Sequence, residues 1–305
     1  MIDTAIMDHV PVILRPDPAR VVIRPFVPAD DPAPRDRPRA QRIADRVRGL
    51  NEEELTGELE RVTAGLSERH HDVEAVLLRR YHDVNGLLID PCTFDRDQSL
   101  LIGAYFSEEH AFEGAALLNP SIVIHPVQSG VANGDVRFVL SLRGVGEGHV
   151  SSVTFRTGIC GADGSINLDA PGLKAVAPRI EMIPGGAADD PGGPDPLGEA
   201  GEVFEHGRFL AGTPPPVLFP VTQRQRHGIE DLRLVRFTDD DGNVTYFGTY
   251  TAFSGLAIRQ EILRTTDFTT FELTALRGDA ATGKGMALFP RRIGGRYSGV
   301  VQGPS

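Results

Sequence analysis

Lysine and cysteine are scarce in this sequence. Lys174 and Lys284 are the two lysines among 31 basic residues, so arginine carries nearly all of the positive charge. With abundant Ala, Gly, Pro and Asp, this bias is typical of a GC-rich genome and indicates no function. Cys92 and Cys160 lack the spacing of metal ligands, so we expect free thiols in a reducing compartment.

Long apolar runs and a secretory leader are also missing. No apolar stretch reaches the length of a membrane span, and residues 1–15 lack the basic start, apolar middle and small-residue cleavage site of a signal peptide. The net charge of -11 disfavours broad binding to nucleic-acid phosphates. We therefore expect a globular cytoplasmic protein that binds neither nucleic acid nor membrane.

The first third of the chain predicts a strand, a linker and helices. Residues 20–28 are β-rich and end at proline, and the Asp- and Pro-rich residues after them read as a linker. From residue 39 the apolar residues follow a helical period, and Asn51 with Glu54 forms a capping box. We expect an N-terminal strand and linker over 1–38 and a helical extension over 39–99.

The two adjacent histidines of this part do not have the spacing of a metal site. His70 and His71 are adjacent at a helix start, which is poor geometry for holding one metal ion. We expect both to be solvated and predict no metal site. Residues 100–118 are apolar and predict a helix or two short turns that end at Asn119.

The rest of the chain, residues 100–305, is predicted to be a β-domain. Beyond Asn119 the apolar period changes to two, and an Asp-Gly turn at 239–243 is a firm hairpin signal. A Gly-, Pro- and Asp-rich stretch over 183–203 predicts a long loop. Short strands at close spacing favour a propeller, a barrel or a sandwich. The expected strands are 121–125, 136–142, 150–156, 231–238, 244–253, 256–265, 270–276, 286–289 and 297–301.

An acid pair, Glu230 and Asp231, begins the densest run of strands. Successive side chains of a strand point to opposite faces, so the two acids cannot face the same way, and one carboxylate can enter a site while the other braces a neighbouring strand. Asp231 and Arg233 share a face, and an arginine orients a carboxylate. The plain alternative is a surface salt bridge at a strand start.

Three further groups could carry chemistry. Asn119 and Ser121 flank a proline, and their polar groups suit sugar hydroxyls, although an ordinary turn explains them as well. Arg143 and His149 lie in a glycine-rich stretch that opens no helix and is therefore no dinucleotide motif. Lys284 stands between glycines, which suits a contact to an anion or a solvated hairpin tip.

These motifs, in this order, resemble glycoside hydrolase family 130, the β-mannoside phosphorylases and related β-mannosidases. The resemblance spans about residues 100–297. It rests on Asn-Pro-Ser at 119–121, the Leu-Arg that closes a strand at 142–143, Gly-Ile-Glu-Asp-Leu-Arg at 228–233, Tyr-Thr-Ala-Phe at 250–253, Thr-x-Asp-Phe at 265–268 and Lys-Gly-Met-Ala-Leu-Phe-Pro at 284–290. Leu232 departs mildly from the family, which usually has Pro or Ala there.

The resemblance implies a mainly β fold, a five-bladed β-propeller of the glycosidase type, here with an N-terminal helical extension. It also implies inverting phosphorolysis of β-mannosides that releases mannose 1-phosphate, with Asp231 as the catalytic proton donor and inorganic phosphate as co-substrate. No other cofactor is implied. By motif match, Arg143 and Lys284 would bind phosphate, and the substrate would contact Asn119, Ser121, Glu230, Arg233 and His149.

Two alternatives stay open. One is an inverting β-mannosidase of the same fold, and the other is a non-catalytic carbohydrate-binding propeller. The family sequence continues well beyond the residue that matches Tyr297, so we expect an incomplete ring of about three sheets with an unpaired edge at its final strands. An unpaired edge can pair with a second copy of the chain, so a homo-oligomer is a further alternative.

Overall fold

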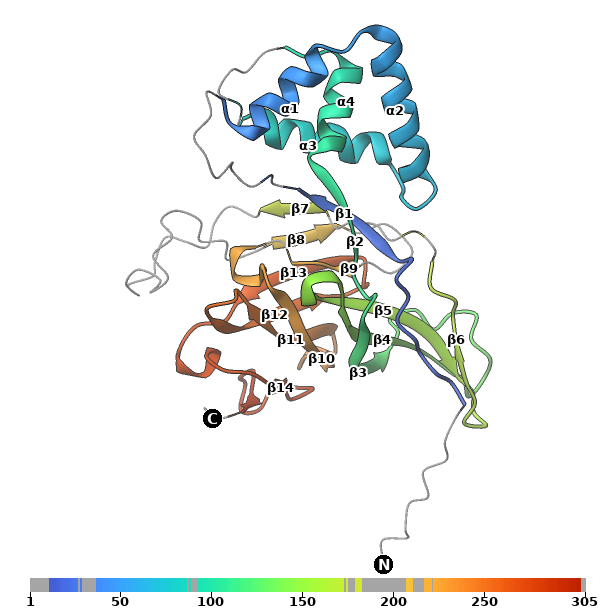
Figure 1. The fold of residues 1–305 in the computed structure, drawn as a ribbon. Helices are drawn as coiled ribbons and strands as arrows, with labels where there is room; N and C mark the ends of the chain where they lie inside the picture. The colour runs from blue at the N-terminus through green and yellow to red at the C-terminus, as the bar shows by residue number, and fades with distance from the viewer. Residues whose placement is uncertain are drawn as a thin grey trace, which may run out of the picture. The chain divides into compact units, whose positions relative to one another are not determined.

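The computed structural model describes residues 11–26, 28, 37–86, 88, 93–172, 174, 179–182, 207–210, 217–220 and 222–302. It divides into two compact units (Figure 1). The helical unit comprises Ala19–Ala111 with Leu173–Ala177, and the remaining residues form the sheet unit. Cys92, most of the expected linker and the expected loop at 183–203 lie outside the described residues.

In its described residues, the helical unit has four helices and one pair of strands. In Figure 1 the helices gather into one bundle. They are α1 (Arg39–Arg48), α2 (Glu52–Ser67), α3 (Val73–Asn85) and α4 (Arg96–Tyr105), and β1 (Val21–Pro25) pairs antiparallel with β2 (Ser107–Ala111). None of the described helices is long and apolar enough to cross a membrane.

Local signals start two of these helices. Asn51 accepts from the backbone N–H of Glu54 at 2.9 Å while the Glu54 carboxylate accepts from the N–H of Asn51, which is the predicted capping box of α2. Asp95 and Gln98 make the same exchange at the start of α4. Both boxes satisfy N–H groups that a helix end otherwise leaves without partners.

Helix α4 is apolar because it packs against each of the other three helices. Residues Leu100 to Gly103 are buried. A Cβ on Gly103 would lie 2.0 Å from the carbonyl oxygen of Leu77, so only glycine allows this approach of α3 and α4. The helix predicted over 100–118 is right only up to Tyr105, since the chain then leaves the helix and pairs as β2 with β1.

The expectation that His70 is solvated is wrong. The side chain of His70 is buried, and its Nε2 lies 2.7 Å from Oε1 of Glu109, which also accepts two hydrogen bonds from Arg69. Burial lowers the pKa of His70, against the opposing effect of Glu109. A helix-start pattern cannot reveal this contact, because Glu109 lies 39 positions further along the chain.

The sheet unit contains an eleven-stranded, mostly antiparallel sheet and a separate pair of strands. The order along the large sheet is β3-β4-β5-β10-β11-β12-β13-β8-β7, with β6 and β9 paired to β5, and β14 pairs with β15. The bounds are β3 (Ala116–Ile124), β4 (Val136–Val145), β5 (Ser151–Cys160), β6 (Ile166–Leu168), β7 (Arg179–Met182), β8 (Gly207–Leu210), β9 (Val217–Leu218), β10 (Gly228–Thr238), β11 (Val244–Phe253), β12 (Ile258–Thr265), β13 (Thr270–Ala275), β14 (Met286–Leu288) and β15 (Gly299–Val301).

Two four-stranded antiparallel meanders, β3–β6 and β10–β13, make up most of this sheet. A single parallel bridge between Gly228 and Ser151 joins them. The predicted Asp-Gly hairpin connects β10 to β11, and Gly242 takes the positive φ of 83° that the turn requires.

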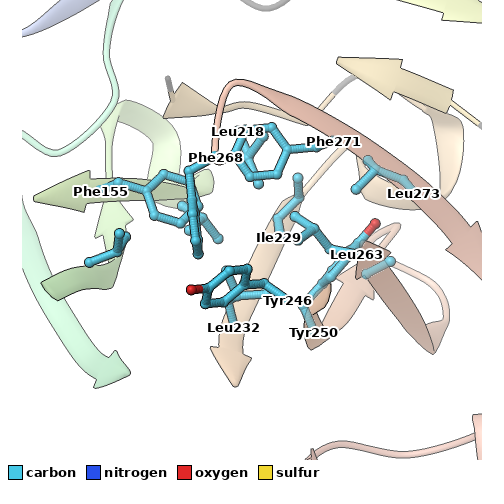
Figure 2. Packing of buried hydrophobic residues seen from close by; sticks show 13 residues of the cluster. Phe155, Leu218, Ile229, Leu232, Tyr246, Tyr250, Leu263, Phe268, Phe271 and Leu273 are labelled. Carbon is cyan, nitrogen blue, oxygen red and sulfur yellow. The ribbon is translucent and has the colours of Figure 1, made fainter. Parts of the chain in front are cut away.

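One hydrophobic core serves both meanders. Phe155 from β5 stacks on Phe271 from β13 at 5.6 Å between ring centroids, and Phe268 contacts both rings edge-on (Figure 2). Ile229 and Leu232 of β10 belong to the same cluster. The face of β10 that carries these residues is therefore fixed by burial, which in turn fixes where its polar residues lie.

A closed five-bladed propeller is not detected among the described residues. Instead of about three separate sheets of four, the described strands give two such meanders within one sheet. Near the final strands, β15 pairs with β14, while Tyr297 and Val300 are more than half exposed. In the large sheet, the edge strand β3 exposes Leu118, Ile122 and Ile124.

Candidate functional site

Two bulged strands bring Asn119 and Asp231 together. The register of β3 against β4 shifts between Leu118 and Ser121, and that of β10 against β11 shifts between Glu230 and Arg233. Asn119 has φ 49° and Asp231 has φ 55°, a left-handed backbone that Asn and Asp tolerate better than most residues. Each bulge re-aims one polar side chain.

Asp231 is oriented by two donors from the other meander. Nδ2 of Asn119 donates to Oδ1 of Asp231 at 2.5 Å, and Nη1 of Arg143 donates to the same oxygen at 3.2 Å. Both described hydrogen bonds end on Oδ1, and the side chain is 29% exposed. The second carboxylate oxygen is therefore available to a ligand.

Arg143 joins the two acids. Its Nε donates to the hydroxyl of buried Ser151 at 2.9 Å, and its Nη2 donates to Oε1 of Glu230 at 2.9 Å. Together with the contact to Asp231, three donors of the guanidinium are used and two remain. The sequence pointed to Arg233 as the partner of Asp231, but Arg233 lies past the bulge and is exposed.

Lys284 completes the site from the loop before β14. Its Nζ lies 2.7 Å from Oε2 of Glu230. The Glu230 side chain is 8% exposed and that of Lys284 is 48% exposed, so the carboxylate is buried while the ammonium keeps donors on the open side. The acid pair is therefore not a salt bridge at the surface, because the buried Glu230 carboxylate pairs with both Arg143 and Lys284.

The remaining predicted residues lie apart from this cluster. Ser121 accepts from the backbone N–H of Leu234 at 2.9 Å and so ties β3 to β10, which is a structural contact. His149 is exposed on the short turn between β4 and β5, and no described hydrogen bond or ion pair joins it to the acids. In the described part of the chain, no group of three His, Cys, Asp or Glu could hold a metal ion.

Sequence reasoning missed three buried polar residues beside the site. Thr249, Thr251 and Gln260 lie on β11 and β12 and are at most 2% exposed. Gln260 and Thr249 hydrogen-bond the loop that carries Lys284. The signal that could have found them is polar side chains within otherwise apolar strands.

Comparisons with known proteins give only distant likenesses. A scan against models of protein families matches none, and a search of curated proteins finds no similar sequence. Among solved structures, β-1,2-mannobiose phosphorylase from Listeria innocua, bound to β-1,2-mannobiose, is similar at 14% identity and a TM-score of 0.28, over 60% of this chain and 51% of that one. A glycosyl hydrolase from Bacteroides ovatus matches at 14% identity and a TM-score of 0.28, over 59% of this chain and 39% of that one.

A third structure is described as belonging to glycoside hydrolase family 130, whose mannoside phosphorylases include hydrolases that target β-1,2-mannosidic linkages in Candida mannan. It matches at 16% identity and a TM-score of 0.31, over 59% of this chain and 39% of that one. The chain thus spans about half or less of the length of these proteins. At such TM-scores the likenesses define neither its fold nor its function.

Proposed function

We propose that this protein is a carbohydrate-active enzyme that cleaves β-mannosides by inverting phosphorolysis. The observation that carries the proposal is the convergence of Asn119, Arg143, Glu230, Asp231 and Lys284 at one partly exposed place. They come from segments up to 165 positions apart (284 − 119), and they are five of the eight residues that the motif resemblance assigns to acid, phosphate and sugar.

The chemistry needs a proton donor on one side of the sugar and a nucleophile on the other. Asp231 supplies the proton to the departing oxygen, through a sugar hydroxyl as the resemblance implies. An oxygen of inorganic phosphate forms the new bond to the anomeric carbon while the glycosidic bond breaks. The products are mannose 1-phosphate and the shortened acceptor, and atoms and charge balance without a second carboxylate base.

Phosphate needs cations that are oriented before it arrives, because repulsion from the Glu230 carboxylate otherwise opposes its entry. Arg143 and Lys284 meet this need. Each is held by an ion pair with buried Glu230, and each keeps N–H groups that can donate to phosphate. The step requires Asp231 to be protonated, so Arg143 and Lys284 against Glu230 leave the cluster with one positive charge in excess. The N–H donors that remain favour a phosphorylase over a mannosidase, which has no phosphate for them to bind.

The architecture belongs to the same proposal. We infer that the meanders β3–β6 and β10–β13 are two blades of a five-bladed propeller, with β3 and β10 as the inner strands that carry the site. The cytoplasmic location expected from the sequence is consistent with the intracellular supply of phosphate that such an enzyme uses.

The test is to incubate the purified chain with β-1,2- and β-1,4-mannobiose, with and without phosphate, and to follow the products by phosphorus NMR and sugar chromatography. We expect mannose 1-phosphate, formed only when phosphate is present. Release of free mannose in phosphate-free buffer would select the mannosidase instead. Binding of mannobiose without turnover would select a non-catalytic sugar-binding protein.

A further inference from the structure

Lys284 lies on a turn whose backbone has little conformational preference of its own. Gly283 and Gly285 on either side have φ of 107° and 74°, which are left-handed conformations that favour glycine. Glycine pairs leave a backbone many accessible conformations, and the lysine side chain is itself long and flexible. The position of the ammonium therefore depends on what holds the turn as well as on the ion pair with Glu230.

Two buried side chains hold it from the sheet beneath. Nε2 of Gln260 donates to the carbonyl oxygen of Gly283 at 2.8 Å, and Oγ1 of Thr249 donates to the carbonyl oxygen of Met286 at 2.5 Å. Gln260 is 2% exposed and Thr249 is 1% exposed. The two contacts clamp the backbone on both sides of Lys284.

Gln260 is itself placed by the strand register. Glu230 on β10 lies opposite Thr251 on β11, which lies opposite Gln260 on β12. Residues directly opposite in a sheet share a face, and Nε2 of Gln260 also donates to Oγ1 of Thr251 at 3.0 Å. The series of contacts ends where it began, at Glu230. Lys284, on the turn that Gln260 holds, donates from its Nζ to Oε2 of Glu230.

We propose that Gln260, together with Thr249, is a positioning residue that sets the place of the Lys284 ammonium. A buried amide is costly unless its groups are paired, and Oε1 of Gln260 has no hydrogen-bond partner within the described part of the chain. An apolar residue would suit this core position better if the amide did not hold the turn. The positioning stands on geometry alone, and only its consequence for phosphate rests on the proposed function.

The two-lysine composition makes the position of Lys284 directly observable. Labelling with lysine enriched in carbon-13 at Cε gives one NMR signal for Lys174 and one for Lys284, assigned with Lys284→Arg. Gln260→Met keeps a similar volume and removes the donor. We expect it to move the Lys284 signal toward that of a free lysine and to leave Lys174 unchanged. If Gln260→Met does not fold, Thr249→Val takes its place in the experiment. It keeps the side-chain shape, removes the donor and should move the same Lys284 signal.

The matched control is Gln225→Met. Gln225 is as buried as Gln260, but it donates to Tyr250 and Glu261 and not to the turn. It tests whether any lost buried amide in this sheet disturbs Lys284. An unchanged Lys284 signal in Gln260→Met and Thr249→Val, or an equal change in Gln225→Met, would overturn the proposal.

Phosphate titration separates this inference from the proposed function. In the unmodified protein, phosphate should move the Lys284 signal, and Gln260→Met should raise the apparent phosphate requirement by about tenfold while the KM for mannobiose stays within about twofold. If phosphate moves neither lysine signal, phosphorolysis is wrong, while the effect of Gln260→Met on Lys284 still decides the positioning. Equal losses for phosphate and mannobiose would contradict a positioning role toward the anion.

Discussion

Asp231 and Lys284 show how burial divides roles among neighbouring charges. Glu230 beside them is buried and spends both carboxylate oxygens on Arg143 and Lys284. Asp231 is more exposed and has both described bonds on one oxygen. The structure thus separates an acid that anchors cations from an acid that can reach a ligand.

Asp231→Asn should keep the fold and lower turnover by on the order of a hundredfold or more, because the amide cannot supply the proton. Production of mannose 1-phosphate measures the loss, and circular dichroism checks the fold. Asp240→Asn, on the exposed turn after β10, is the matched control and should leave turnover unchanged. Near-normal turnover in Asp231→Asn would remove this residue from the mechanism.

Lys284→Ala should raise the apparent phosphate requirement by on the order of tenfold and weaken mannoside binding much less, since its proposed partner is the anion. Steady-state kinetics with either substrate varied gives the two values. Lys174→Ala is the control, because Lys174 donates to the carbonyl oxygen of Ser67 in the helical unit. Equal effects on both substrates would instead assign Lys284 to the shape of the loop.

At the scale of elements, caps and bulges do different work. A cap satisfies N–H groups within one turn of helix and is visible in the local sequence. A bulge serves a tertiary purpose, because the shifts in β3 and β10 turn Asn119 and Asp231 toward each other across 112 positions of sequence. The caps therefore contribute to the stability of single helices, and the bulges position side chains of the site.

Asn51→Ala should destabilise the helical unit by about 1 kcal/mol, because it removes one half of the capping box of α2. Thermal unfolding followed by circular dichroism at 222 nm measures the change. Glu60→Ala, at an exposed position of the same helix, should change stability by less than about 0.5 kcal/mol. Activity should be equal in both variants, and a stability unchanged by Asn51→Ala would show that packing alone starts the helix.

At the scale of the whole molecule, each unit has its own core and its own exposed features. The helical unit buries His70 against Glu109, and the sheet unit exposes an apolar edge along β3. Burial lowers the pKa of His70, and the hydrogen bond from Arg69, followed by that from His70, lowers the pKa of Glu109 against the opposing effect of burial. Both shifts make acid unfavourable to the folded helical unit.

The stability of the helical unit should fall as pH drops through 6.5, the ordinary pKa of histidine, because the unfolded chain then takes up a proton that folded His70 resists. The contribution of Glu109 is lost later, as pH falls through 4.5 toward its lowered pKa. Thermal melts between pH 8 and pH 4 test this. His70→Gln should remove the first decrease, whereas His71→Gln at the exposed neighbour should keep it. An unchanged decrease in His70→Gln would refute the assignment.

The exposed edge should make the protein associate as concentration rises, because Ile122 and Ile124 on β3 are 58% and 47% exposed, and among the described strands β3 pairs along one side, with β4. Ile122→Lys should reduce the mass measured by light scattering at high concentration. Ile13→Lys, at an exposed apolar residue outside the described strands, is the control. A protein that stays monomeric at all concentrations would contradict this expectation.

The sequence by itself determined the features that depend on neighbours along the chain. The capping box at Asn51, the hairpin turn at 239–243 and the β-rich runs were predicted within a few residues of the observed elements. The acid pair, Asn119, Arg143 and Lys284 were also selected from their residue types and order. For the cap, the turn and the strands, short-range hydrogen bonding and hydrophobic period suffice, because they act within one turn or one hairpin.

Only the tertiary structure decided which of these residues meet. It replaced Arg233 by Arg143 as the partner of Asp231, set Ser121 and His149 apart from the cluster, buried His70, and placed Gln260 beneath Lys284. Among the described residues the predicted ring of blades was likewise not detected, and one sheet that contains two meanders was found. The physical reason is that register shifts and the burial of Ile229 and Leu232 fix where side chains of β10 point, and those forces join segments more than a hundred positions apart.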